Sequence, residues 1–133
     1  MLQFTPQHRL LLATKPIDFR KGIDSLAACC RQVLAEDPFS GTFFIFTNKR
    51  KTAVKILVYD GQGFWLCLKR FSKGRLAWWP DKQAIRQSLS AQQLTLLLYQ
   101  AHPLQAKLPA DFRPVSPDSS TAKSPQGSRA PPG

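Results

Sequence analysis

The centre of the chain reads T-F-F-I-F-T-N-K-R-K-T-A-V-K-I-L-V-Y-D-G-Q-G-F-W-L-C-L-K-R, residues 42–70. Three runs rich in β-branched and aromatic residues, 42–47, 53–59 and 64–70, are separated by short polar breaks. A fourth run, R-L-A-W-W at 75–79, follows the break S-K-G. Such runs are typical of strands, and short turns force neighbouring strands to run antiparallel. The stretch therefore predicts a four-stranded antiparallel meander.

A helix is predicted on each side of this meander. Upstream, an apolar run at 10–12 predicts a first strand, and Asp18 resembles a helix N-cap. Apolar residues at helical spacing follow it: Phe19, Ile23, Leu26, Ala27, Cys30 and Leu34. Downstream, Ser90 and Gln93 have the spacing of a capping box before an apolar stripe at Leu94, Leu97, Leu98 and Ala101. We expect an α+β fold with both helices on one face of the sheet.

The composition divides the chain at residue 109. Residues 1–108 are long enough for one compact domain with its own core. The last 25 residues hold six prolines and only two large apolar residues, Phe112 and Val115. Such a segment buries too little surface to offset its ordering entropy. We predict a disordered tail at 109–133.

The charge is strongly positive, and the cysteines are few. Nineteen Lys and Arg against eight Asp and Glu give a net charge of +11, which favours phosphate-rich partners. Cys29, Cys30 and Cys67 have neither metal-site spacing nor an even number for disulfides, so we expect reduced thiols. No signal-peptide pattern or membrane-length apolar run is present. We expect a cytoplasmic protein with no membrane contact.

The hairpin around D-G-Q-G, residues 60–63, decides which lysines share a face of the sheet, because strand side chains alternate between faces. A three-residue loop with Tyr59 opposite Gly63 puts Lys55 and Lys69 together. Six apolar side chains then share the other face: Val54, Ile56, Val58, Phe64, Leu66 and Leu68. An even loop separates the two lysines and places each among hydrophobic residues, and burying an unpaired lysine is costly. We therefore expect the odd loop.

This part of the chain is the candidate nucleic-acid surface. Between 49 and 75 one acid, Asp60, accompanies eight cations: Lys49, Arg50, Lys51, Lys55, Lys69, Arg70, Lys73 and Arg75. Cations could hold phosphates, and Tyr59 and Trp65 could stack on bases. Basic turns also occur on ordinary soluble sheets, where lysines at an edge discourage aggregation. The net charge of the whole chain favours nucleic-acid contact, whereas Trp65, Trp78 and Trp79 are more typical of core or interface residues than of base-stacking ones.

No catalytic pattern is present. His8 and His102 lack a nucleophile or an acid nearby in sequence, and no phosphate-binding loop occurs. Two-metal catalysis needs several converging carboxylates, and each aspartate considered has a structural role as a cap, turn or surface residue. We predict a protein that is not an enzyme and has no metal, no cofactor and no small-molecule substrate.

Several motifs resemble a known family. D-F-R-K-G at 18–22, D-P-F-S-G at 37–41, K-I-L-V-Y-D-G-Q-G at 55–63, K-R at 69–70 and W-P at 79–80 occur in the order found in the TnpB (Orf2-like) accessory proteins of bacterial insertion sequences of family sixty-six. The resemblance covers roughly residues 8–98. Where family members continue their last helix with an L-E-G-I-D-like segment, this chain has Y-Q-A-H at 99–102.

The resemblance implies a non-catalytic protein that is needed for transposition beside a separate, larger transposase. The family's basic positions correspond to Arg20, Lys21, Lys55, Lys69 and Arg70, and its turn and cap positions to Asp18, Gly22, Asp60, Gly61 and Gly63. Our leading hypothesis is an accessory factor that binds the DNA of the element ends through these and the neighbouring cations. The alternative is an interaction module that docks on the transposase through Trp65, Trp78 and Trp79.

Overall fold

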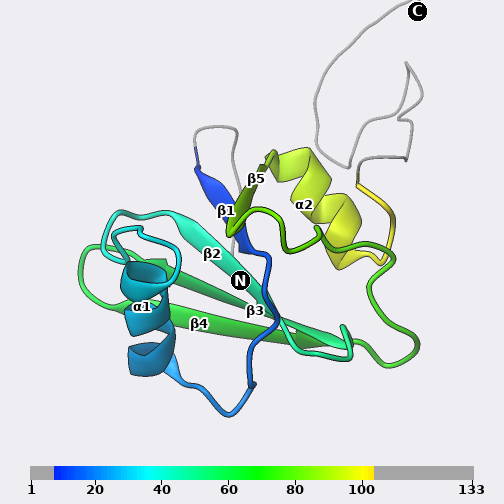
Figure 1. Cartoon of the computed structure of the whole chain (residues 1–133), viewed down its shortest axis with the longest axis horizontal. Coiled ribbons are helices and arrows are strands. Elements are labelled where there is room, and N and C mark those ends of the chain that lie inside the picture. Colours follow the sequence, from blue (N-terminus) through cyan, green and yellow to red (C-terminus); the bar gives the residue numbers. More distant parts are fainter. Residues whose placement is uncertain (1–7, 104–133) are drawn as a thin grey trace, which may run out of the picture. The chain divides into compact units, whose positions relative to one another are not determined.

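The computed structural model describes residues 8–103, which form a five-stranded sheet and two helices (Figure 1). The elements are β1 (Leu10–Ala13), α1 (Ile23–Gln32), β2 (Phe43–Thr47), β3 (Ala53–Tyr59), β4 (Phe64–Arg70), β5 (Arg86–Leu89) and α2 (Ala91–Leu98). The α+β class is therefore confirmed. The predicted tail at 109–133 and the domain boundary at 108 lie outside the described residues.

The strand order is β4-β3-β2-β1-β5. The meander of β2, β3 and β4 is confirmed, and β1 runs parallel to β2 with α1 as the connection. The predicted fourth strand at 75–79 is wrong, because the last strand is β5, which pairs antiparallel with β1. Residues 75–79 turn inward instead: Leu76 and Trp79 are buried, and the Trp79 indole N–H donates to the Ala13 and Thr14 carbonyls at 3.2 and 3.1 Å.

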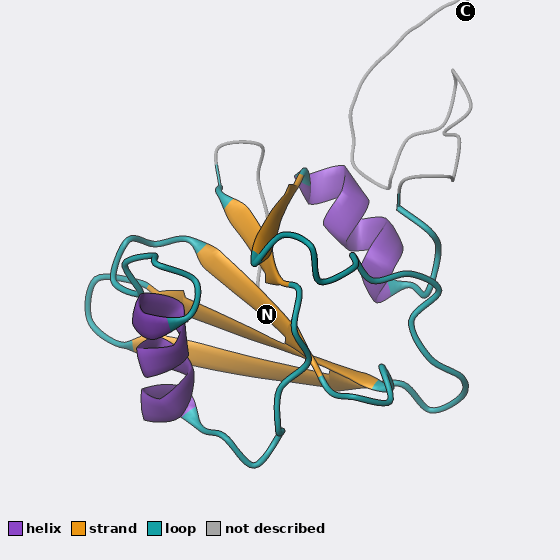
Figure 2. Cartoon of the chain, in the orientation of Figure 1, coloured by secondary structure: helices purple, strands orange, loops and turns teal. Residues whose placement is uncertain are grey.

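The two helices cover opposite faces of the sheet, and Figure 2 shows them well separated. The α1 face is formed by Leu11, Ala13, Leu26, Ala27, Cys30, Leu34, Phe44, Phe46 and Leu57. The α2 face includes Leu10, Leu12, Phe43, Ile45, Val54, Ile56, Val58, Leu94 and Leu97. Our expectation that both helices lie on one face is wrong. The strands β1 and β2 are apolar at nearly every position, so both faces must be covered to remove them from water.

The helix starts show one wrong and one confirmed prediction. Gly22, rather than Asp18, is the N-cap of α1, and it makes no side-chain cap. The Asp18 carboxylate instead accepts hydrogen bonds from the backbone N–H of Arg20 at 2.9 Å and from its Nη2 at 2.6 Å. The capping box of α2 is confirmed, because Ser90 Oγ accepts from the Gln93 N–H while Gln93 Oε1 accepts from the Ser90 N–H.

Candidate nucleic-acid interface

The β3–β4 loop has four residues, because Tyr59 pairs with Phe64. The predicted three-residue loop is therefore wrong. A single carboxylate stabilises the even loop: Asp60 Oδ1 accepts from the N–H groups of Gln62 and Gly63, both at 2.9 Å, and Oδ2 accepts from the Trp65 indole N–H at 2.7 Å. The backbone hydrogen bonds from Gln62 and Gly63 are the main reason that the pKa of Asp60 is lowered.

The even loop places Lys55 on the α1 face, opposite Leu68. The side chain is buried, with 9% of the residue exposed. Its ammonium group donates to the carbonyls of Phe19 at 2.7 Å and Lys21 at 2.9 Å, and lies 4.9 Å from the centre of the Phe19 ring. These acceptors offset the cost of desolvation that had argued against this register. Lys55 thus holds the turn before α1 against β3.

Lys69 points to the opposite face, toward α2. Its Nζ atom donates to the Leu98 carbonyl at 2.6 Å and lies 4.8 Å from the centre of the Tyr99 ring. A cation at the carbonyl end of a helix is stabilised by the helix dipole and by the unpaired carbonyls there. Because the Lys55 and Lys69 ammonium groups both have protein acceptors, neither is well placed to hold a phosphate.

The remaining cations gather at one end of the sheet. We call this group the basic end; it consists of Lys49, Arg50, Lys51, Arg70, Lys73 and Arg75, all of them exposed except for the partly exposed Lys51. The β2–β3 turn forms its tip. Asn48 closes this turn: its carbonyl accepts from the Lys51 N–H at 3.0 Å, and its side-chain Oδ1 accepts from the Thr52 N–H at 2.9 Å. Lys49 and Arg50 are therefore the central residues of a fixed turn.

Main-chain hydrogen bonds hold the second half of the basic end against this turn. The Phe71 N–H donates to the Thr52 carbonyl at 3.0 Å, and the Leu76 N–H donates to the Lys51 carbonyl at 2.8 Å. The Gln100 side chain, just after α2, donates to the Lys73 and Arg75 carbonyls at 2.8 and 3.1 Å. Two segments that carry three cations each are thus fixed side by side.

These six charges are not neutralised within residues 8–103. The ion pairs found there are Arg9–Glu36, Arg86–Glu36 and Arg20–Asp18, none of which includes a residue of the basic end. None of the six side chains forms a hydrogen bond to another described residue. Among the described residues, the basic end therefore presents six positive charges without an ion-pair partner, and such a cluster attracts polyanions.

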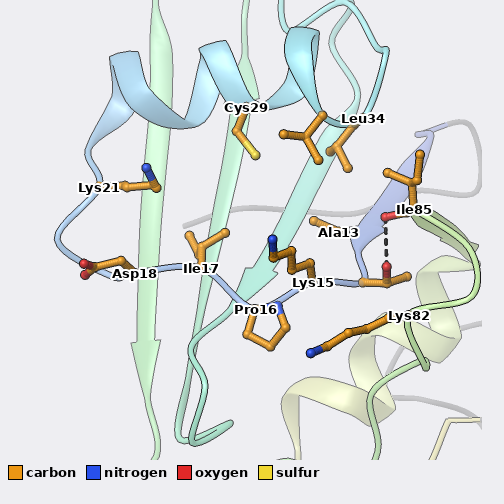
Figure 3. Close-up of a pocket in the computed structure, with 12 residues that line it drawn as sticks. Ala13, Lys15, Pro16, Ile17, Asp18, Lys21, Cys29, Leu34, Lys82 and Ile85 are labelled. Carbon is orange, nitrogen blue, oxygen red and sulfur yellow. Dashed lines mark hydrogen bonds between the residues drawn. The ribbon is translucent and has the colours of Figure 1, made fainter.

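Arg20 and Lys21, the two other predicted contacts, lie in the turn before α1. The Arg20 hydrogen bonds lower the pKa of the Asp18 carboxyl to about 2, so much of the Arg20 charge is balanced locally. Lys21 lines a pocket of about 350 Å³ (Figure 3). Lys15 and Lys82 also line it, and these two had no signal in the sequence because each is an isolated cation far from the other in the chain.

A family model described as "IS66 Orf2 like protein" matches residues 8–107. The chain belongs to the IS66 Orf2-like family. The similar proteins include two from Sinorhizobium fredii (strain NBRC 101917 / NGR234), the uncharacterized proteins y4jC and y4hO. They are 32% and 36% identical over 90 residues, which is 68% of this chain and 76% and 77% of theirs. No solved structure matches the chain.

As a member of this family, the chain is an accessory protein associated with insertion sequences. The family is one of accessory proteins and is not known for enzymatic activity. Among the described residues of this IS66 Orf2-like protein, no three His, Cys, Asp or Glu side chains are arranged to hold a metal ion. Within the same residues, no helix is long and apolar enough to cross a membrane.

The predicted aromatic contacts of this IS66 Orf2-like protein do not form one surface. Trp79 is 8% exposed, and its indole N–H donates to the Ala13 carbonyl at the end of β1. Trp78 packs on the α2 face, and its ring centre lies 5.7 Å from that of His102. Trp65 is 55% exposed, at the far end of the sheet beside the β3–β4 loop. Tyr59 is partly exposed and packs there against Phe64, with ring centres 5.1 Å apart. The two aromatic residues predicted to stack on bases, Tyr59 and Trp65, therefore lie away from the basic end.

Proposed function

We propose that this protein is a non-catalytic accessory protein of transposition, acts in the bacterial cytoplasm, and binds DNA of the insertion sequence through the basic end. The observation that carries the proposal is the pairing of two fixed segments that present six cations without an ion pair among the described residues. Arg20, Lys21, Lys55 and Lys69 are not part of the proposed surface, because they lie elsewhere or are already bound.

The proposed contact is with the phosphate backbone. Cations that neutralise phosphates release condensed counterions, so affinity should fall steeply as the salt concentration rises. Six neutralised phosphates would give a slope of log affinity against log salt of roughly −5, at about −0.9 per phosphate. Phosphate contacts carry no sequence information directly, so such binding contributes position and affinity rather than sequence recognition.

The alternative, docking on the transposase through Trp65, Trp78 and Trp79, has less support from the geometry. Trp79 is buried, and Trp65 and Trp78 lie at opposite ends of the sheet. If the transposase is a partner, a different surface would have to bind it.

Fluorescence anisotropy with a labelled terminal-repeat duplex tests the proposal. We expect binding that weakens steeply with salt, and that Arg50→Glu weakens it at least tenfold at low salt. Arg31→Glu is the matched control, because it makes the same change in net charge from an exposed position in the last turn of α1. Absent binding, salt-independent binding, or equal losses in the two variants would contradict the proposal. Addition of the transposase then shows whether affinity depends on that partner.

A further inference from the structure

The strand β4 lies at one edge of the sheet, and within residues 8–103 no other strand pairs with its outer side (Figure 1). It has seven residues, of which the first five, F-W-L-C-L, carry no charge and no proline. Trp65 and Leu68 are each 55% exposed. Edge strands are usually short, charged or covered, because an open apolar edge pairs with other chains. The opposite edge follows that rule, since β5 has only four residues and begins with Arg86.

The hydrogen bonds at both ends of the hairpin show which backbone groups of β4 point outward. Asp60 N–H donates to the Gly63 carbonyl, and Phe71 N–H donates to the Thr52 carbonyl. In an antiparallel pair of strands, hydrogen-bonded and non-hydrogen-bonded residue pairs alternate. With the observed register, the N–H and C=O groups of residues 65, 67 and 69 therefore point toward β3. The outward groups therefore belong to Phe64, Leu66, Leu68 and Arg70.

We propose that two copies of this chain pair through β4, antiparallel and centred on Cys67, to form a continuous ten-stranded sheet. In this register every outward backbone N–H and C=O group forms a hydrogen bond: those of Leu66 pair with Leu68 of the second copy, and those of Phe64 pair with Arg70 of the second copy. The remaining cross-strand pairs, which are not hydrogen-bonded, are Trp65 with Lys69 of the second copy, and Cys67 with Cys67 of the second copy. Cations thus stand opposite aromatic rings, and no pair joins like charges.

The edge favours a second copy as its occupant because it is complementary to itself. Its basic residues, Lys69 and Arg70, lie at the C-terminal end, whereas Asp60 lies in the turn before its N-terminal end. An antiparallel two-fold arrangement brings Lys69 and Arg70 of each copy toward the Asp60 turn of the other copy. A parallel arrangement would place like charges together.

Disulfide trapping of the full chain tests this register. In a Cys29→Ser, Cys30→Ala background, Cys67 faces Cys67 of the second copy as a non-hydrogen-bonded pair, with Cα atoms about 4.5 Å apart, within disulfide range. Mild oxidation should therefore yield a covalent dimer. The control moves the thiol by one position, as Leu68→Cys combined with Cys67→Ser. The two cysteines of the dimer are then offset by two residues along the strands, with their Cα atoms roughly 8 Å apart, so no crosslink should form.

Sedimentation velocity tests the association itself, on nuclease-treated protein in about 0.5 M salt, where DNA bridging is screened. We expect twice the monomer mass. Leu68→Pro should yield a monomer, because it removes an outward N–H and leaves the β3 hydrogen bonds intact. Circular dichroism checks that this variant is folded, and Leu68→Lys replaces it if it is not. A monomer at every soluble concentration overturns the proposal. A dimer that survives these variants, or that does not crosslink at Cys67, overturns it as well.

Discussion

Lys55 and Lys69 lie on adjacent strands but on opposite faces of the sheet. Each ammonium group is bound to main-chain carbonyls: Lys55 to the turn before α1, and Lys69 to the last turn of α2. The two lysines therefore attach the two helical layers to the central hairpin. Their role in folding can be separated from the role of the basic end by substitution.

Lys55→Met should destabilise the fold by about 3 kcal/mol, because the carbonyls of Phe19 and Lys21 lose a charged donor in a buried place. Methionine keeps most of the apolar stem, so the loss reports the ammonium group. Urea unfolding measures the change. Lys82→Met, at an exposed position, is the control and should change the free energy of unfolding by less than about 0.5 kcal/mol. A neutral Lys55→Met would contradict the anchoring role.

Lys69→Met should have a smaller effect, about 1 kcal/mol or less, because Lys69 is exposed and its bond to the Leu98 carbonyl competes with water. The effect should be local. We expect faster amide hydrogen exchange in the last turn of α2 and at Tyr99, with the β-strands unchanged. Uniformly faster exchange across the sheet would show that Lys69 does not act on α2 alone.

Lys51→Gly should stabilise the protein while it weakens DNA binding. Lys51 has a φ of 59°, in the left-handed region, where a side chain costs about 1 kcal/mol relative to glycine. The substitution also removes one cation from the basic end. Thermal unfolding should therefore shift upward, while the dissociation constant for DNA rises. Lys49→Gly, at the tip of the same turn, should weaken binding without the gain in stability.

Removal of single charges from the basic end should make DNA binding less dependent on salt, because each variant neutralises fewer phosphates. Each of Arg50→Ala, Arg70→Ala and Arg75→Ala should reduce the slope of log affinity against log salt by about one. Lys55→Met, measured at a temperature where it is folded, should leave the slope unchanged. Equal slopes for all four variants would place the DNA-binding surface elsewhere on the protein.

Glu36 should make the fold sensitive to acid. Its carboxylate accepts from Arg9 at 2.7 Å and from Arg86 at 2.8 Å, and its side chain is only 11% exposed. The hydrogen bond from Arg9 is the main reason that the pKa of Glu36 is lowered from 4.5. A lowered folded pKa means that this contribution is fully present above pH 4.5 and is lost as the pH falls through the folded value.

Thermal unfolding between pH 6 and pH 3 measures this contribution. We expect Glu36→Gln to be less stable than the unsubstituted protein at pH 6 and to lose less stability as the pH falls. Asp24→Asn, at an exposed position in α1, should follow the unsubstituted protein. If Glu36→Gln lost as much stability between these pH values as the unsubstituted protein, the ion pairs of Glu36 with Arg9 and Arg86 would not be the source of the acid sensitivity.

Local sequence determined the elements whose stabilising groups are close together in the chain. The three strands of the meander were predictable from their β-branched and aromatic runs, and the α2 start from Ser90 and Gln93, which bind each other across three positions. The number of residues in the β3–β4 loop, four rather than three, was not predictable in this way. The three hydrogen bonds to Asp60 favour four loop residues, whereas polarity along the strands favoured three.

Partners distant in sequence explain the other errors. Lys55 could be placed among hydrophobic residues only because the Phe19 and Lys21 carbonyls, more than thirty positions earlier, receive its ammonium group. Trp79 leaves the predicted strand because its indole N–H finds acceptors at the end of β1. The basic end was predicted in outline, since its two segments are each rich in cations, but the main-chain hydrogen bonds that join them, from Phe71 to Thr52 and from Leu76 to Lys51, are tertiary features.

The position of β1 between β2 and β5 has a consequence for the nascent chain. Leu10 pairs with Phe43 on one side and with Leu89 on the other, so the pairing of β1, the first of the described strands along the chain, is completed only when the last of them, β5, is present. The β2–β4 hairpins can form as they leave the ribosome, because their partners are neighbours in sequence. One edge of β1 can pair with β2 once these hairpins have formed, whereas its other edge stays open until β5 has emerged, and a stalled or truncated product would present that open edge to proteases and chaperones.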